Sequence, residues 1–154
     1  MRRNQKGRAE AKLRGGFEPK IKAQLENAKV NFAYEPIRIP YVIPEQTHYY
    51  LPDWVLLDNG IVVETKGYPF DAADRKKILL VRAQHPDLDL RLVFSSSNIK
   101  IYPGSKTTVA DWASREGIPH AEKRIPDEWL FEPPRVSSVT ALQRLMTSKT
   151  TKKP

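Results

Sequence analysis

An Asn59-Gly60 pair between two apolar segments is the feature of this 154-residue sequence that most limits its fold. The pair separates residues 48–57 from residues 61–66, both rich in valine, leucine, isoleucine and aromatic side chains. Asn-Gly between such segments is a strong signal for a tight β-hairpin turn. We therefore predict two antiparallel, neighbouring strands over these two ranges.

Three charged residues of this hairpin form a candidate site. Glu64 and Lys66 are two residues apart and so face the same side of a strand, with Asp53 on the partner strand. Carboxylates suit Mg²⁺, and a neighbouring ammonium can stabilise charge on a phosphate. The backbone carbonyl of Thr65 and the carboxylate of Glu18 are further oxygen donors. The spacing indicates a metal-dependent phosphodiester hydrolase, although an exposed ion pair beside turn acids fits it too.

Local context favours the metal site over the exposed ion pair. Asp53 is followed by Trp54 and a run of aliphatic residues, and Glu64 follows three aliphatic residues. A charge in such apolar strands is costly unless a partner such as a metal ion offsets it. One or two Mg²⁺ ions, with Mn²⁺ as a substitute, are the expected cofactors.

The remaining patterns alternate between helical and extended periods. Helices are predicted over residues 17–29, 71–85 and 108–116, and strands over 32–39 and 89–95. Weaker patterns predict a short edge strand over 99–102, a turn of helix over 126–130 and an amphipathic helix over 139–146. Two prolines stiffen residues 40–44 and limit their hydrogen bonding. This order predicts an α/β (α+β) fold with a mixed central sheet flanked by helices.

Positive charge is concentrated at the two ends of the chain. The net charge is +8, whereas residues 1–16 and residues 133–154 each carry +5, so the intervening body is slightly acidic. Basic ends commonly contact nucleic-acid phosphates, although a solvated tail gives the same composition. We predict a flexible basic arm over residues 1–16, a folded domain over residues 17–132 and a mobile basic tail over residues 133–154.

Composition also excludes several classes of protein. The chain has no cysteine, which rules out disulfides, thiolate metal sites and cysteine nucleophiles. Its apolar runs are too short to span a bilayer, and the basic N-terminus is not followed by the apolar stretch of a secretory signal. We expect an intracellular protein with no membrane partner and no small-molecule cofactor.

Several short motifs resemble one nuclease family. Pro52-Asp53 followed by Glu64-Thr65-Lys66 matches the PD-(D/E)xK nuclease pattern. The chain more specifically resembles the phage endonuclease I family, the Holliday-junction resolvases of short-tailed lytic phages. The matching segments are Tyr34-Glu35, residues 40–44, 52–53, 63–67, 74–77, 84–86 and 93–97.

The resemblance implies a specific enzyme. It implies a restriction-endonuclease-like core in a domain-swapped homodimer that cuts four-way junctions and other branched DNA by paired, metal-dependent nicks, in the cytoplasm of an infected bacterial host. The family's catalytic positions correspond to Glu18, Asp53, Glu64 and Lys66, with Asp53 and Glu64 as the main metal ligands. Residues 40–44 would bridge the dimer halves, and each active site would take Glu18 from one chain and the other three residues from its partner.

Contacts with DNA are predicted from charge and position. The candidates are Arg2, Arg3, Lys6, Arg8, Lys12, Arg14, His48, Arg75, Lys76 and Lys77. A loop histidine and a solvated helix face are the alternatives for the last four. A sequence- or mismatch-specific nuclease on the same scaffold and a non-catalytic basic DNA-binding protein are the competing functions. The intact Asp53, Glu64 and Lys66 favour an enzyme, because a protein that only binds DNA does not need acids near phosphate.

Overall fold

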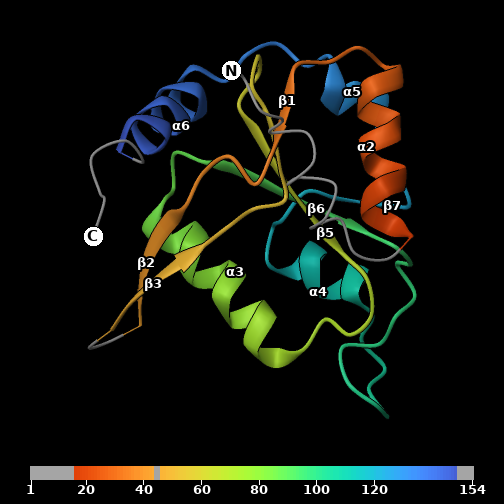
Figure 1. Cartoon of the computed structure of the whole chain (residues 1–154). Coiled ribbons are helices and arrows are strands. Elements are labelled where there is room, and N and C mark those ends of the chain that lie inside the picture. The colour runs from red at the N-terminus through yellow and green to blue at the C-terminus, as the bar shows by residue number, and fades with distance from the viewer. Residues whose placement is uncertain (1–15, 44–45, 149–154) are drawn as a thin grey trace.

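The computed structural model describes residues 16–43 and 46–148. Its centre is a five-stranded sheet in the order β1-β4-β5-β6-β7, where β1 is Phe32–Tyr34, β4 is Trp54–Leu56, β5 is Ile61–Lys66, β6 is Asp89–Phe94 and β7 is His120–Glu122 (Figure 1). Strands β1, β4 and β5 pair antiparallel, whereas β5, β6 and β7 pair parallel. The predicted mixed sheet within an α/β fold is therefore confirmed.

Helices cover both faces of the sheet. Ile21 and Leu25 of α2 (Phe17–Asn27) and Leu130 of α5 (Asp127–Leu130) pack in one hydrophobic cluster. The other cluster receives side chains from α3 (Ala72–Gln84), α4 (Val109–Arg115) and α6 (Val136–Ser148). Strand β5 contributes Val63 to the first cluster and Val62 to the second. Because both faces of β5 are buried, a charge on this strand is enclosed by the core.

The hairpin predicted from Asn59-Gly60 is present as β4 and β5. Trp54 pairs with Val63, and the strands are joined by residues 57–60. The strand expected over residues 48–57 is interrupted at residues 51–53. Pro52 explains the interruption, since proline has no N–H to donate to a ladder. Asp53 therefore directly precedes β4.

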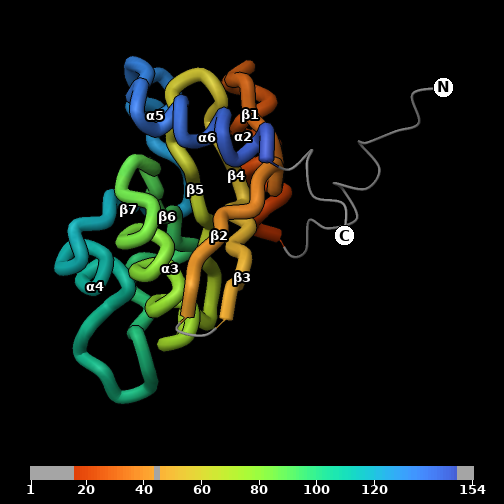
Figure 2. The backbone as a smooth tube through the Cα atoms, turned by 90° about the vertical axis from the view of Figure 1, so that its left-hand side faces the viewer, coloured from red at the N-terminus to blue at the C-terminus, as the bar shows by residue number. Residues whose placement is uncertain are grey.

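A separate two-stranded ribbon extends beside α3 (Figures 1 and 2). It consists of β2 (Ile39–Ile43) and β3 (Gln46–Tyr50), paired antiparallel. The side-chain amide of Gln84 accepts from the Val42 N–H at 2.7 Å and donates to the Val42 carbonyl at 2.9 Å. His85 Nε2 contacts the carbonyl of Pro40. The end of α3 thus holds the outer edge of β2.

The strand expected over residues 32–39 is also divided. It ends at Tyr34, and the segment beyond the break joins the ribbon as β2. Glu35 has a φ of 46°, which lies in the left-handed region, and Pro36 follows it. A left-handed residue and a proline both break strand pairing.

The helix expected over residues 139–146 of the C-terminal segment is present and is longer than predicted. Helix α6 occupies Val136–Ser148, and Leu142 is 3% exposed. The Ser138 hydroxyl donates to the Gly60 carbonyl at 2.6 Å and accepts from the Asp89 N–H at 3.1 Å. These contacts place α6 over the turn of the β4–β5 hairpin.

The edge strand expected over residues 99–102 is absent from the described chain. An isolated bridge between Lys100 and Thr108 takes its place. Among the described residues, no helix is long and apolar enough to cross a membrane. Outside them lie residues 1–15, which contain Arg2, Arg3, Lys6, Arg8, Lys12 and Arg14, together with residues 44–45 and 149–154.

Gly60 supplies a test of the packing between α6 and the hairpin. Its φ is 83°, and an added Cβ would lie 2.9 Å from both Cγ2 and N of Val139. Gly104 is a matched control, because its φ is 85° but nothing lies within 4 Å of an added Cβ. We expect Gly104→Ala to lower the free energy of unfolding by about 1 kcal/mol and Gly60→Ala by about 2–4 kcal/mol in urea denaturation. Equal losses would contradict the close packing of α6.

Candidate active site

Asp53 and Glu64 lie opposite each other on neighbouring chain segments. The pairing of Trp54 with Val63 places Glu64 across from Asp53, whose N–H lies 3.4 Å from Glu64 Oε2. The two residues are 8% and 5% exposed. The proximity predicted from the hairpin is therefore present, and both acids are buried.

Thr65 fixes the carboxylate of Asp53. Its N–H and its hydroxyl both donate to Asp53 Oδ2, at 2.9 Å and 2.6 Å. Burial raises the pKa of Asp53 above its ordinary value, while the bonds from Thr65 and the charge of Lys66 oppose this shift. The geometry leaves Asp53 Oδ1 without a bond from Thr65.

Lys66 lies between two carboxylates. Its Nζ is 3.2 Å from Glu64 Oε1 and 3.8 Å from Asp74 Oδ1. Burial alone would lower the pKa of Lys66, but Glu64 and Asp74 raise it overall. Lys77 approaches the same Asp74 oxygen at 3.8 Å. Lys66 is therefore a charged ammonium held between the buried Glu64 and the partly exposed Asp74.

Glu64 also accepts a hydrogen bond from the hydroxyl of Tyr50 through Oε2. Burial and the nearby charge of Asp53 raise the pKa of Glu64 to about 7, against the lowering effect of Lys66 and Tyr50. A cation placed between or beside two such carboxylates would stabilise their ionised forms.

Glu18 lies in the first turn of α2, where Pro19 is tolerated. Its Oε2 accepts a hydrogen bond of 2.8 Å from the hydroxyl of Tyr34, on the strand next to β4. Burial and Glu18 raise the pKa of this hydroxyl well above its ordinary value, so it remains a donor. The centroid of the Tyr34 ring lies 4.7 Å from that of the Trp54 ring, and Trp54 directly follows Asp53. Glu18 is thus anchored one strand away from Asp53.

The donor set of this site suits a hard divalent cation. Asp53 and Glu64 offer carboxylate oxygens and Thr65 a backbone carbonyl, the ligand types that Mg²⁺ prefers. Within residues 16–43 and 46–148, no three acidic or histidine side chains are grouped closely enough to hold a metal ion. The single chain therefore brings together Asp53, Glu64, Thr65 and Lys66, but does not add Glu18 to them as a third side-chain ligand.

The predicted DNA-contacting residues in the described chain have different surroundings. Arg75 Nη1 donates to the carbonyls of Phe70 and Ile101 at 2.7 Å and 2.9 Å. His48 contacts Gln46 Oε1 at 3.2 Å. Lys76 is exposed. Arg75 has a structural role that the charge pattern did not predict.

Sequence reasoning missed three polar residues around the site, Tyr34, Tyr50 and Asp74. Each contacts one predicted catalytic side chain, but none is linked to it by a short motif. Tyr34 lies in a segment that resembles the family, and Tyr50 in a predicted strand, but neither pattern indicates a contact with a catalytic side chain. Their proximity to Glu18 and Glu64 depends on strand pairings that the sequence does not specify.

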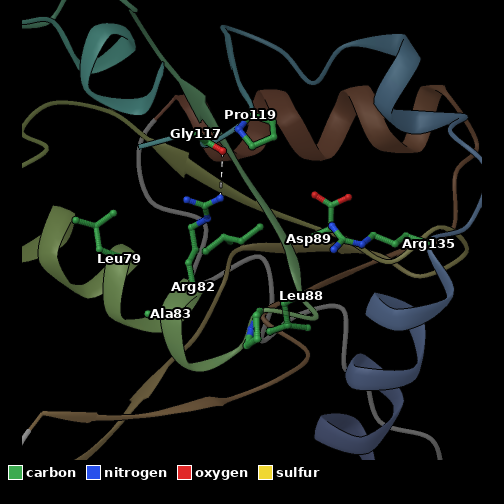
Figure 3. Close-up of a pocket in the computed structure, with 10 residues that line it drawn as sticks. Leu79, Arg82, Ala83, Leu88, Asp89, Gly117, Pro119 and Arg135 are labelled. Carbon is green, nitrogen blue, oxygen red and sulfur yellow. Dashed lines mark hydrogen bonds between the residues drawn. The ribbon is translucent and has the colours of Figure 1, made fainter. Parts of the chain in front are cut away.

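A cavity of about 530 Å³ lies elsewhere, between the end of α3, the start of β6 and residues 117–119 (Figure 3). Arg82 lines it and donates to the Gly117 carbonyl at 3.1 Å. Asp89 and Arg135 line another part of its wall. None of the predicted catalytic residues borders this cavity, so it is separate from the candidate active site.

The pKa of Glu64 predicts a pH-dependent stability. Because its folded value of about 7 lies above the ordinary 4.5, the folded chain binds more protons between these values and loses stability as the pH rises through them. We expect Glu64→Gln to raise the free energy of unfolding by about 2 kcal/mol at pH 8 in EDTA, relative to the unsubstituted chain. The difference should be smaller near pH ~4.5. Urea denaturation at both pH values measures this. The exposed Glu116→Gln variant is the control, and a less stable Glu64→Gln protein at pH 8 would contradict the expectation.

A mixed sheet that carries two buried acids and a lysine, in the order Pro52-Asp53 and Glu64-Thr65-Lys66, has the residue pattern of a PD-(D/E)xK nuclease. A family model described as Phage endonuclease I matches residues 1–152. This chain belongs to the phage endonuclease I family.

Two relatives agree with this assignment. Endonuclease I of Escherichia phage T7 is 48% identical over 132 residues, which cover 86% of this chain and 87% of that protein. Endodeoxyribonuclease 1 of Enterobacteria phage T3 is 54% identical over 121 residues, which cover 79% of this chain and 78% of that protein. The family resemblance noted from the motifs is therefore confirmed, and the chain is a nuclease.

Proposed function

We propose that this protein is a structure-selective DNA endonuclease that resolves four-way junctions and other branched DNA by paired, Mg²⁺-dependent nicks. The name of the phage T3 relative, an endodeoxyribonuclease, supports DNA as the substrate. The observation that carries the proposal is the buried pair of Asp53 and Glu64, with Nζ of Lys66 3.2 Å from Glu64 Oε1. Burying two acids is costly unless a cation and a charged substrate make use of them.

The residues of the site divide the work of hydrolysis. Asp53 and Glu64, with the Thr65 carbonyl, would hold Mg²⁺, for which Mn²⁺ would substitute. The bound ion would lower the pKa of a water molecule and offset charge at the scissile phosphate. Lys66, kept charged by Glu64 and Asp74, orients the attacking water and stabilises the charge that develops in the transition state. Glu18, held by Tyr34, supplies a further carboxylate.

The proposal includes a homodimer with shared active sites, in which residues 40–44 bridge the two halves. Glu18 precedes this segment along the chain, whereas Asp53, Glu64 and Lys66 follow it. An exchange at the ribbon would therefore combine Glu18 of one protomer with the other three residues of its partner. Two coupled sites match the two-fold symmetry of a four-way junction, and such an enzyme would act inside the infected host cell.

Cleavage of defined DNA substrates tests this function. The purified protein is incubated with a four-way junction and with a linear duplex of the same arm sequence, in Mg²⁺ and separately in Ca²⁺. We expect paired nicks in the junction only with Mg²⁺, and binding without cleavage in Ca²⁺. Equal cleavage of the linear duplex would refute junction selectivity.

Sizing of the protein in solution tests the shared sites. We expect a dimer, together with restored cleavage when Glu18→Gln and Lys66→Ala chains are unfolded together and refolded as a mixture. Mixed dimers would hold one site with neither substitution, because Glu18 and Lys66 of each site come from different chains. A monomer, or a mixture as inactive as its components, would refute the exchange.

A further inference from the structure

We propose that Tyr50 is a positioning residue that fixes the orientation of the Glu64 carboxylate for a divalent cation. The inference rests on the proposed metal-dependent function and deepens it. The Tyr50 hydroxyl donates a hydrogen bond to Glu64 Oε2, and the residue is only 3% exposed. No motif of the sequence indicated this role.

The contacts of Glu64 distinguish its two oxygens. Oε2 takes the Tyr50 hydroxyl and lies 3.4 Å from the Asp53 N–H, whereas Oε1 lies 3.2 Å from the Lys66 ammonium. Rotation about the last side-chain bond of a glutamate is otherwise broad and nearly two-fold. The hydroxyl therefore prevents the carboxylate from turning and leaves Oε1 on the side of the catalytic lysine.

Tyr50 can fulfil this role because its own position is fixed by several elements. It pairs with Ile39 at one end of the β2–β3 ribbon, and its ring belongs to the hydrophobic cluster under α3. The Lys77 ammonium lies 5.9 Å from the ring centroid. Outer contacts that orient a metal ligand typically contribute 10–100-fold to metal affinity or activity.

Calorimetric titration of the full chain with Ca²⁺, in the absence of DNA, tests the inference without relying on activity. We expect Tyr50→Phe, which keeps the ring and removes the hydroxyl, to weaken Ca²⁺ binding about 10-fold or more. Tyr41→Phe is the matched control. Tyr41 is buried on the same face of the ribbon, and within the described part of the chain its hydroxyl forms no hydrogen bond, so Ca²⁺ affinity should be unchanged.

A double substitution separates orientation from a general loss of structure. In a Glu64→Gln background, Tyr50→Phe should cause no further loss of Ca²⁺ affinity, because its effect passes through the Glu64 carboxylate. An equal further loss in that background, or a Tyr50→Phe protein with unchanged affinity, would overturn the inference. An unsubstituted chain that binds no Ca²⁺ would instead refute the proposed metal site. Urea denaturation of each variant verifies that the fold is retained.

Discussion

Replacing Lys66 by alanine is expected to lower the rate of junction cleavage in Mg²⁺ by about 10²–10³-fold, the usual effect of removing one preorganised group that stabilises transition-state charge. The Lys66 ammonium lies 3.2 Å from Glu64 and 3.8 Å from Asp74, and these acids keep it charged. Single-turnover cleavage at saturating enzyme measures the chemical step, and a gel-shift assay in Ca²⁺ measures junction binding. Binding should persist while cleavage is lost.

Lys106→Ala is the control for the loss of one positive charge. Lys106 is exposed and has no contact with the candidate active site, so its replacement should leave the cleavage rate unchanged. A Lys66→Ala protein that cleaves at the full rate would show that the lysine of the nuclease pattern is not part of the catalytic machinery.

Replacing Arg91 by methionine is expected to lower the free energy of unfolding by about 3–5 kcal/mol. Arg91 is 8% exposed and forms paired hydrogen bonds of 2.7–2.9 Å with both Asp89 and Glu132. Its guanidinium also lies 5.0 Å from the ring centroid of Trp129. Removal of Arg91 leaves the buried Asp89 carboxylate without its countercharge, which is why the loss should be large. Urea denaturation at neutral pH provides the measurement.

Arg124→Met provides the comparison for an exposed ion pair. The side chains of Arg124 and Asp127 form an ion pair of 2.9 Å but are 63% and 69% exposed. We expect a loss of about 1 kcal/mol or less, because solvent screens such pairs. Similar losses for the two arginines would mean that the buried network around Arg91 contributes no more than a surface pair.

The sequence was most informative where local rules act alone. Asn59-Gly60 predicted the hairpin, and the pairing of Trp54 with Val63 brings Asp53 opposite Glu64 as that hairpin required. The alternation of Glu64 and Lys66 likewise predicted their contact. In these cases the two side chains belong to one strand or to two strands joined by a short turn.

Prediction failed where a distant partner decides the structure. The short strand β7 has no apolar alternation, and it exists through its parallel pairing with β6. Helix α6 was underestimated because Ser138 does not read as a core residue, yet its hydroxyl is fully buried between Gly60 and Asp89. The same limit hid Tyr50, whose contact with Glu64 depends on the placement of the ribbon.

Helix α6 also determines where this enzyme can be shortened or fused to another protein. A chain that stopped at residue 132, the predicted end of the folded domain, would lose the hydroxyl of Ser138 and the apolar side chain of Leu142. The Gly60 carbonyl at the tip of the β4–β5 hairpin and the Asp89 N–H would then lose their contact with Ser138. An affinity tag or a fused targeting domain therefore belongs after Ser148, the last residue of α6.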